Sequence, residues 1–147
     1  RPKALGLRVD RANLVRAVDP AEGAVTALAH FNESVSSTLL FATRRGVVHG
    51  WDLRSAAEPL ALRLPEDTGF LSTLAVGTDR HWVLGGTTRG YLALWDLRFG
   101  LLVSLWRHSS RGAIHRLANA SSALNAAAAE AAQERPLSYV ATGANEV

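Results

Sequence analysis

The 147-residue sequence contains neither cysteine nor methionine. Without cysteine the chain can form no disulfide framework and offers no thiol nucleophile or thiolate metal ligand, a composition that is typical of a reducing compartment. We therefore expect a cytoplasmic location. Because no methionine marks an initiation site, the sequence also predicts a piece excised from a longer protein.

Long apolar runs and strong charge are missing as well. The apolar share is 48%, yet no run reaches the ~18 residues that indicate a membrane-spanning helix. The 16 basic and 13 acidic residues leave a net charge of only +3, and the arginines are dispersed along the chain. A field this weak, without aromatic residues regularly placed between the basic ones, does not favour a nucleic-acid partner.

Motifs of catalysis and metal binding are also absent. No Gly-x-Ser-x-Gly, phosphate-loop or dinucleotide fingerprint occurs, and the glycines of "LGGTTRG" (84–90) are followed by neither lysine nor a helical pattern. The histidines show no pairing at helical spacing, and they are His30, His49, His81, His108 and His115. The sequence therefore predicts no catalytic residue, no cofactor and no metal site, and ordinary structural roles for the histidines.

What the sequence does contain is an internal repeat. "TRRGVVHGWDLR" (43–54) aligns with "TTRGYLALWDLR" (87–98), and Thr, Arg, Gly, Trp, Asp, Leu and Arg match in register 44 residues apart. A period of about 40–45 residues that ends in Trp-Asp is typical of four-stranded propeller blades. The repeat therefore predicts an all-β fold, a fragment of a β-propeller with about three blades.

Short apolar segments bounded by turn residues lie around the two signatures. In the first unit, residues 24–64, we expect strands over 24–31, 37–44, 47–53 and 59–64. In the second unit, residues 70–108, we expect strands over 70–77, 82–88, 91–97 and 101–108. Each unit is thus predicted to form one antiparallel blade whose strands are buried on both faces.

The two ends of the sequence are less regular. Residues 1–23 contain two strand-like runs and are predicted to finish a preceding blade. A third unit, 113–147, has strand patterns over 113–120 and 137–147 and stops before a third Trp-Asp, which predicts an incomplete blade. Its extra stretch, 121–136, is rich in alanine and predicts a short helical or disordered insertion at the surface; a partner-binding helix is the less favoured interpretation.

The signature residues have structural roles in this interpretation. Gly46 and Gly90 supply the positive φ of a tight turn. Trp51 and Trp95 fill the space between neighbouring blades, where each buried indole N–H needs an acceptor. The carboxylates of the two aspartates accept hydrogen bonds from backbone amides of the following turn, and these residues are Asp52 and Asp96.

Arginines and two other tryptophans offer candidate binding positions. Arg45 and Arg89 occupy equivalent turns and are expected on one rim, where they either bind an acidic partner or simply face solvent. The opposite rim is expected to carry Arg54 and Arg98. The tryptophans outside the signatures, Trp82 and Trp106, are predicted to pack in the core or between blades rather than to bind a partner.

These residues resemble WD40-repeat proteins. More narrowly, "GWDLR", "LWDLRF", "HWVLGGTTRG", "SLWRH" and "YVATGANEV" resemble the C-terminal WD-repeat region of the regulatory subunits of class III phosphatidylinositol 3-kinase complexes. The resemblance covers most of residues 24–147 and is strongest over 81–108. WD40 proteins often link a turn Asp, a His, a Ser or Thr and the Trp by hydrogen bonds, whereas Arg45 and Arg89 stand at the turn positions here.

The resemblance implies a seven-bladed propeller and a non-catalytic scaffold. It implies a lipid kinase catalytic subunit and Beclin-type coiled-coil subunits as partners, and peripheral association with endosomal or autophagic membranes through the complex. The protein-kinase-like and HEAT regions of that family have no counterpart in this sequence, so no catalytic role is carried over. The alternative interpretation is a generic WD40 adaptor that binds peptides or an acidic surface.

Overall fold

The computed structural model describes residues 17–55, 57–119 and 138–143. Over these ranges the chain forms ten β-strands and one short 3-10 turn, η1 (Pro20–Glu22). The all-β prediction is confirmed. No helix within these ranges has the length and apolar character needed to cross a bilayer.

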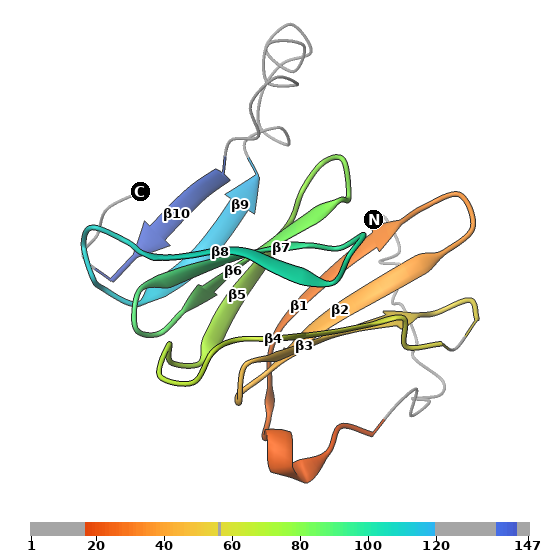
Figure 1. Ribbon diagram of the computed structural model, residues 1–147, viewed down its shortest axis with the longest axis horizontal. Coiled ribbons are helices and arrows are strands. Elements are labelled where there is room, and N and C mark those ends of the chain that lie inside the picture. Colours follow the sequence, from red (N-terminus) through yellow and green to blue (C-terminus); the bar gives the residue numbers. More distant parts are fainter. Residues whose placement is uncertain (1–16, 56, 120–137, 144–147) are drawn as a thin grey trace, which may run out of the picture.

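The strands form three antiparallel sheets (Figure 1). Sheet 1 has the order β1 (Val25–Asn32), β2 (Ser37–Thr43), β3 (Val47–Asp52) and β4 (Leu60–Arg63). Sheet 2 has the order β5 (Leu71–Val76), β6 (Trp82–Thr87), β7 (Tyr91–Asp96) and β8 (Leu101–Arg107). Sheet 3 pairs β9 (Ile114–Asn119) with β10 (Ser138–Thr142). Eight of these strands fall within the predicted segments and are one or two residues shorter, whereas β1 ends one residue later than predicted and β10 covers only part of 137–147.

The sheets stand side by side in chain order, and the first strands of the three, β1, β5 and β9, are neighbours (Figure 1). The described strands do not close into a ring. A propeller therefore stays a prediction. The N-terminal runs of 1–16, the insertion 121–136 and Asn145, which aligns with the turn glycines, lie outside the described residues.

The pairing register repeats in all three sheets. Each first hairpin has one irregularity beside a threonine: between Val25 and Ala27 opposite Thr43, between Leu71 and Thr73 opposite Thr87, and between Ala141 and Thr142 in sheet 3. All three threonines, Thr43, Thr87 and Thr142, are buried. A β-bulge of this kind fixes the local twist and register, so its recurrence marks sheet 3 as a third copy of the same first hairpin.

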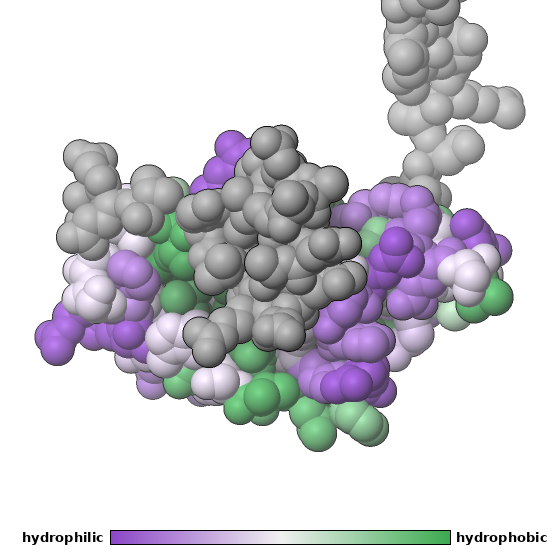
Figure 2. All heavy atoms as spheres, turned by 90° about the horizontal axis from the view of Figure 1, so that it is seen from above, coloured by the Kyte–Doolittle hydropathy of each residue, from purple (hydrophilic) through white to green (hydrophobic). Residues whose placement is uncertain are grey.

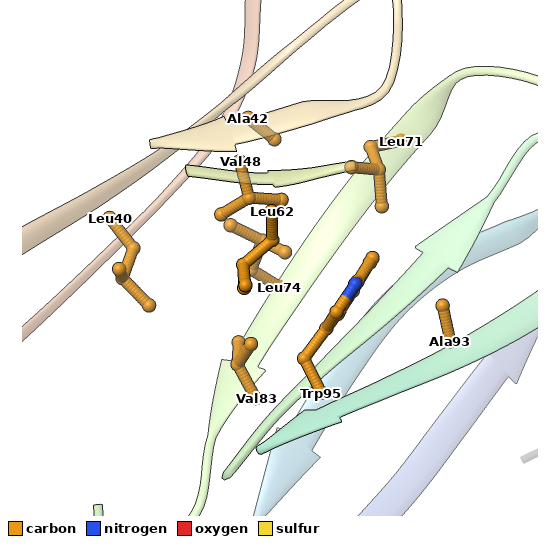
Figure 3. Close-up of a cluster of buried hydrophobic side chains, with 9 residues drawn as sticks. All are labelled: Leu40, Ala42, Val48, Leu62, Leu71, Leu74, Val83, Ala93 and Trp95. Carbon is orange, nitrogen blue, oxygen red and sulfur yellow. The ribbon is translucent and has the colours of Figure 1, made fainter. Parts of the chain in front are cut away.

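Two apolar clusters join the sheets. The first lies between sheets 1 and 2, where Leu40, Val48 and Leu62 of sheet 1 meet Leu71 and Trp95 of sheet 2 (Figure 3). The second lies between sheets 2 and 3 and contains Ala75, Leu84, Leu92, Ile114 and Leu117. Burial of this apolar area against the next sheet is what holds one sheet to another.

The prediction that all strands are buried on both faces is wrong for β1, β4 and β8, whereas β5, the first strand of sheet 2, has no exposed residue. In β1 the side chains alternate between half-buried and exposed, and in β8 six of the seven residues are exposed. The middle strands β2, β3, β6 and β7 do have buried residues on both faces. Burial on both faces requires a neighbouring sheet on each side, and β5 has one because it lies between β1 and β9.

Candidate functional site

The turns that precede the two signature strands have the same geometry. Gly46 has φ of +80° and Gly90 has φ of +78°. The amide of Gly46 donates to the carbonyl of Thr43, and that of Gly90 donates to the carbonyl of Thr87, at 2.9 and 3.1 Å. Left-handed backbone of this kind favours glycine, which explains why both copies place it there.

Arg45 and Arg89, next to these glycines, line one depression of about 370 Å³ at the surface. Both side chains are exposed. The structure thus brings the two predicted rim residues together, although they are 44 positions apart in the sequence. Guanidinium groups are strong donors to carboxylates, so this depression can accept an acidic group.

The rim is not uniformly basic. Glu66 and Asp67 line the same depression, and Arg89 donates from Nη1 to the carbonyl of Asp67 at 2.9 Å. The guanidinium of Arg44 lies 4.6 Å from the ring centroid of Phe70, which is a cation–π contact. A ligand at this rim therefore meets arginines that already hold defined positions.

The signature tryptophans differ in burial. Trp95 is 1% exposed and belongs to the cluster between sheets 1 and 2, with its indole directed toward Leu71 and Leu62 (Figure 3). Trp51 is only half-buried, because its position opposite Leu39 places it on the face of sheet 1 that is turned away from sheet 2. Trp95 therefore fills the space between two sheets, whereas for Trp51, which has no preceding sheet among the described residues, that role stays a prediction.

The expected acceptor for the buried indole is also missing. Trp95 Nε1 is buried and has no hydrogen-bond partner among the residues that the structure describes. The physical reason is that the side chains of its cluster are aliphatic and supply no oxygen. An unsatisfied buried donor of this kind costs about 1–3 kcal/mol of folding free energy.

The signature aspartates do accept hydrogen bonds from the following turns. Asp52 Oδ1 accepts from the Arg54 amide at 3.0 Å and from the Ser37 amide at 3.1 Å, and Oδ2 accepts from the Ser55 hydroxyl at 2.6 Å. The Ser55 hydroxyl and these amides lower the pKa of Asp52 to about 2. This carboxylate joins β2, β3 and the turn after β3.

Asp96 reaches a similar pKa by a different route. Its Oδ2 accepts from Arg98 Nη2 at 2.6 Å, and its Oδ1 accepts from the Arg98 amide at 2.9 Å. The Arg98 guanidinium is the main cause that lowers the pKa of Asp96 to about 2. Of the predicted opposite rim, Arg98 is thus occupied by Asp96, while Arg54 Nη1 donates to the Ser34 carbonyl at 3.1 Å.

One polar cluster escaped the sequence reasoning. His49 in β3 is buried, stacks on Phe41 with ring centroids 4.9 Å apart, and meets a carboxylate at each ring nitrogen. Nε2 lies 2.6 Å from Glu22 Oε2, and Nδ1 contacts Glu58 Oε1. Both ring nitrogens of His49 therefore have a carboxylate within hydrogen-bond distance. No sequence motif predicts this cluster, because Glu22 and Glu58 lie on either side of His49 at separations that match no known pattern.

The other histidines have local partners, as expected for structural roles. His30 Nε2 lies 3.0 Å from the Ser37 hydroxyl, His108 Nδ1 lies 2.8 Å from the Ser110 hydroxyl, and His81 Nδ1 lies 3.6 Å from Asp79. His115 lies close to Gly143. The structure therefore does not bring the five histidines together.

The two tryptophans outside the signatures, Trp82 and Trp106, also differ in burial. Trp82 packs against the cluster between sheets 2 and 3. Trp106 is 41% exposed and does not lie in the core of the described residues, so packing between blades stays a prediction for it. Leu101, Leu102 and Val103 of the same strand are also exposed. The space-filling view shows hydrophobic residues exposed at the surface between hydrophilic ones (Figure 2).

Known proteins were compared with the chain as a whole. No family model matches it. It is 35% identical over 83 residues to the probable serine/threonine-protein kinase vps15 of Dictyostelium discoideum, which covers 56% of this chain and 4% of that protein. It is 30% identical over 135 residues to the serine/threonine-protein kinase VPS15 of Arabidopsis thaliana, which covers 90% of this chain and 9% of that protein. The chain spans less than a tenth of the length of these curated relatives.

Proposed function

Because the chain is homologous to a segment of the VPS15 serine/threonine kinases, we propose that it is part of a WD-repeat scaffold in the regulatory subunit of a class III phosphatidylinositol 3-kinase complex. In this role it acts in vacuolar sorting and autophagy. It holds protein subunits and takes no part in phosphoryl transfer. The observation that carries the proposal is the match over 135 residues, within which the structure places two copies of one four-stranded sheet.

Packing of the described residues supports a scaffold. The repeated residues lie at turns and bulges or form the apolar contacts between sheets. The two signature aspartates stabilise turns through hydrogen bonds. Successive sheets joined by apolar clusters fit a propeller, which we propose with seven blades as in the family that the sequence resembles. The domain division into units at 24–64, 70–108 and 113–147 belongs to the same proposal.

The proposed partners are the lipid kinase catalytic subunit and Beclin-type coiled-coil subunits. The proposed location is cytoplasmic, peripheral on endosomal and autophagic membranes through these partners. A tagged chain expressed in cells is expected to retain both classes of subunit after affinity purification and to colocalise with them on those membranes. Retention of neither subunit by a folded chain would contradict the proposal.

The affinity purification needs a matched negative control. Trp95→Arg places a charge in the cluster that joins sheets 1 and 2 and is expected to abolish retention of both subunits along with the fold. Phe99→Ala removes an exposed aromatic side chain outside that cluster and is expected to leave retention unchanged. Equal retention by Trp95→Arg and the parent chain would show that the folded sheets do not carry the interaction.

A second candidate function is an adaptor that binds an acidic peptide at the rim. It is favoured by one observation, that Arg45 and Arg89 line the same depression. Replacing both by glutamate is expected to abolish binding of an acidic partner, because two positive charges become negative and the net charge at this place falls by four units. The matched control, Arg63→Glu with Arg116→Glu, makes the same change in net charge at exposed positions elsewhere. Loss of binding in both double variants would indicate only long-range attraction.

A further inference from the structure

A groove of about 490 Å³ lies between sheets 1 and 2, bordered by the β1–β2 and β5–β6 turns. These two turns lie at the same end of their sheets (Figure 1), and the turns that contain Arg45 and Arg89 lie at the other end. Because all four strands of both sheets are present, no further strand of the repeat is needed to fill the groove. Its volume is in the range of ligand-binding sites.

The inner part of the groove is apolar. Phe31, Leu60 and Leu97 line it, and each is half-buried and packs against the cluster between sheets 1 and 2. Val35, at the β1–β2 turn, also lines the groove and is 83% exposed. An apolar side chain that entered the groove would therefore be removed from water together with the groove's own apolar surface.

The wall formed by sheet 1 is acidic. Glu33 and Asp52 line it. Glu33 accepts a hydrogen bond from the Ser36 hydroxyl at 3.1 Å, and Asp52 accepts only from backbone amides and a serine hydroxyl. Neither carboxylate forms an ion pair with a cation among the described residues, so this wall can attract a positive group from a ligand.

The wall formed by sheet 2 is basic. Arg80, His81 and Arg98 line it. Arg98 is held by Asp96, and His81 Nδ1 lies 3.6 Å from Asp79. Arg80 is exposed and makes no hydrogen bond or ion pair with any residue that the structure describes. Its guanidinium is therefore available to a carboxylate of a ligand.

The backbone of Arg80 does not favour an arginine. Its φ is +62°, a conformation that suits glycine, whereas Ser36, the residue 44 positions earlier, has no positive φ. The turn around Arg80 is nevertheless well held, because the Arg80 amide donates to the Gly77 carbonyl at 2.9 Å and the His81 amide donates to Asp79 Oδ1 at 3.0 Å. The turn thus positions a free cation beside the groove.

We propose that the groove binds an extended peptide segment of a partner protein in which one apolar side chain stands between an acidic and a basic residue. The apolar side chain enters between Phe31, Leu60 and Leu97. The acidic residue pairs with the guanidinium of Arg80, and the basic residue pairs with Glu33 on the other wall. Because the walls have opposite charge, only one direction of the peptide satisfies both. The groove is separate from the Arg45 and Arg89 depression, and its ligand does not depend on the lipid kinase subunits.

The probes are two blocked synthetic peptides of opposite direction, GESLSKG and GKSLSEG, titrated into the ¹⁵N-labelled 147-residue chain and followed by NMR. One of them is expected to bind saturably with a Kd of about 1 mM or lower, and the other at least about fivefold more weakly. Amide signals of Val35, Arg80 and Leu97 are expected to shift. Replacing leucine by serine in the peptide is expected to weaken binding at least about tenfold, because the apolar contact is lost.

Three results of these titrations would overturn the proposal. They are no saturable binding of either peptide, equal affinity for the two directions, and shifts at the turns of Arg45 and Arg89 in place of the groove.

Two variants of the chain locate the acidic contact. Arg80→Gly suits the positive φ and keeps the turn, so it removes the cation without unfolding the chain, and it is expected to weaken binding about fivefold. Replacing the peptide's glutamate by serine is then expected to cost nothing further. Arg111→Gly is the matched control, because Arg111 is also exposed with a positive φ and does not line the groove.

The control variant is expected to bind the peptide as the parent chain does. Parent affinity in Arg80→Gly, or an equal loss in Arg111→Gly, would overturn the assignment of Arg80. Retention of lipid kinase subunits is measured separately, so failure of the peptides leaves that proposal standing.

Discussion

Sheets 1 and 2 contain the same signature, but the tryptophan of the signature is buried to a different extent in each sheet. Trp95 is sealed between the two sheets, whereas Trp51, at the equivalent position, is half-buried on the far face of sheet 1. Each tryptophan points toward the preceding sheet, and only sheet 2 has a preceding sheet among the described residues. The comparison shows that the motif directs an indole toward the preceding sheet, and that the indole is buried only where such a sheet is present.

The largest expected effect tests this comparison directly. Trp95→Ala removes a fully buried indole and is expected to lower the free energy of unfolding by about 3–5 kcal/mol. Trp51→Ala is expected to cost about 1–2 kcal/mol, since less packing is lost. Urea denaturation followed by far-UV circular dichroism measures both values. Equal losses in the two variants would show that the motif, and not the neighbouring sheet, determines the stability.

The turn glycines are expected to differ next. Both have positive φ, so alanine at either position costs about 1–2 kcal/mol in backbone strain. At Gly90 an added Cβ would also lie 2.6 Å from the Gly112 carbonyl oxygen, whereas at Gly46 its nearest neighbour is the Leu64 side chain at 3.1 Å. Gly90→Ala is therefore expected to destabilise the protein by at least about 1 kcal/mol more than Gly46→Ala.

The same urea experiment measures the two glycine variants side by side. Backbone atoms of Gly112 cannot move aside as the end of a flexible side chain can, which is why the difference has a definite sign. A larger loss in Gly46→Ala than in Gly90→Ala would contradict this assignment.

His49 has no counterpart in sheet 2, where the equivalent residue is Ala93. Replacing Glu22 by glutamine is expected to destabilise the protein by about 1 kcal/mol, because it weakens a charge-assisted hydrogen bond to a buried ring. In a His49→Ala background the same change is expected to have almost no effect. Thermal unfolding of the four chains of this double-mutant cycle gives the coupling energy. A coupling of zero would mean that the contact contributes nothing.

The smallest expected effect is the difference between Asp52 and Asp96 in how salt changes the pH dependence of stability. Both have pKa values lowered to about 2, so each ionised carboxylate stabilises the fold fully above pH ~4, and this stabilisation is lost as the pH falls toward 2. Asp52→Asn and Asp96→Asn should each reduce the dependence of Tm on pH in that window. Salt is expected to weaken the Asp96–Arg98 contribution, which is an exposed ion pair, more than that of Asp52.

Melting curves between pH 2 and 6 at about 0.01 and 1 M salt test this difference, since the screening length falls from about 30 to 3 Å. If both aspartates lose their effect equally in high salt, the hydroxyl and amide bonds of Asp52 are not what stabilises its charge.

Much of the fold could be predicted from the sequence. The 44-residue spacing of Gly46 and Gly90, and of Trp51 and Trp95, defined two equivalent units, and alternating apolar residues located their strands. The turns followed from glycine. These features depend on local backbone preference and on side-chain period, both of which a single sequence contains.

Which faces of the sheets are covered by a neighbouring sheet could not be predicted. Apolar character marks Trp51 and Trp106 as suited to burial, but burial also requires a neighbouring sheet that the residues themselves do not encode. Likewise the cluster of His49 with Glu22 and Glu58 forms only when η1 and the turn after β3 fold against the sheet. The missing acceptor of Trp95 Nε1 depends on which side chains surround it in three dimensions.

The solitary indole N–H of Trp95 also makes this residue a natural optical probe. Because the described residues give its Nε1 no acceptor and its cluster is apolar, its fluorescence should lie at shorter wavelength than that of Trp51 and Trp106, which reach the surface. Separation of the first two sheets would hydrate the ring and shift its emission to the red. In a variant that keeps Trp95 as its one tryptophan, the emission wavelength therefore reports when the contact between sheets 1 and 2 opens.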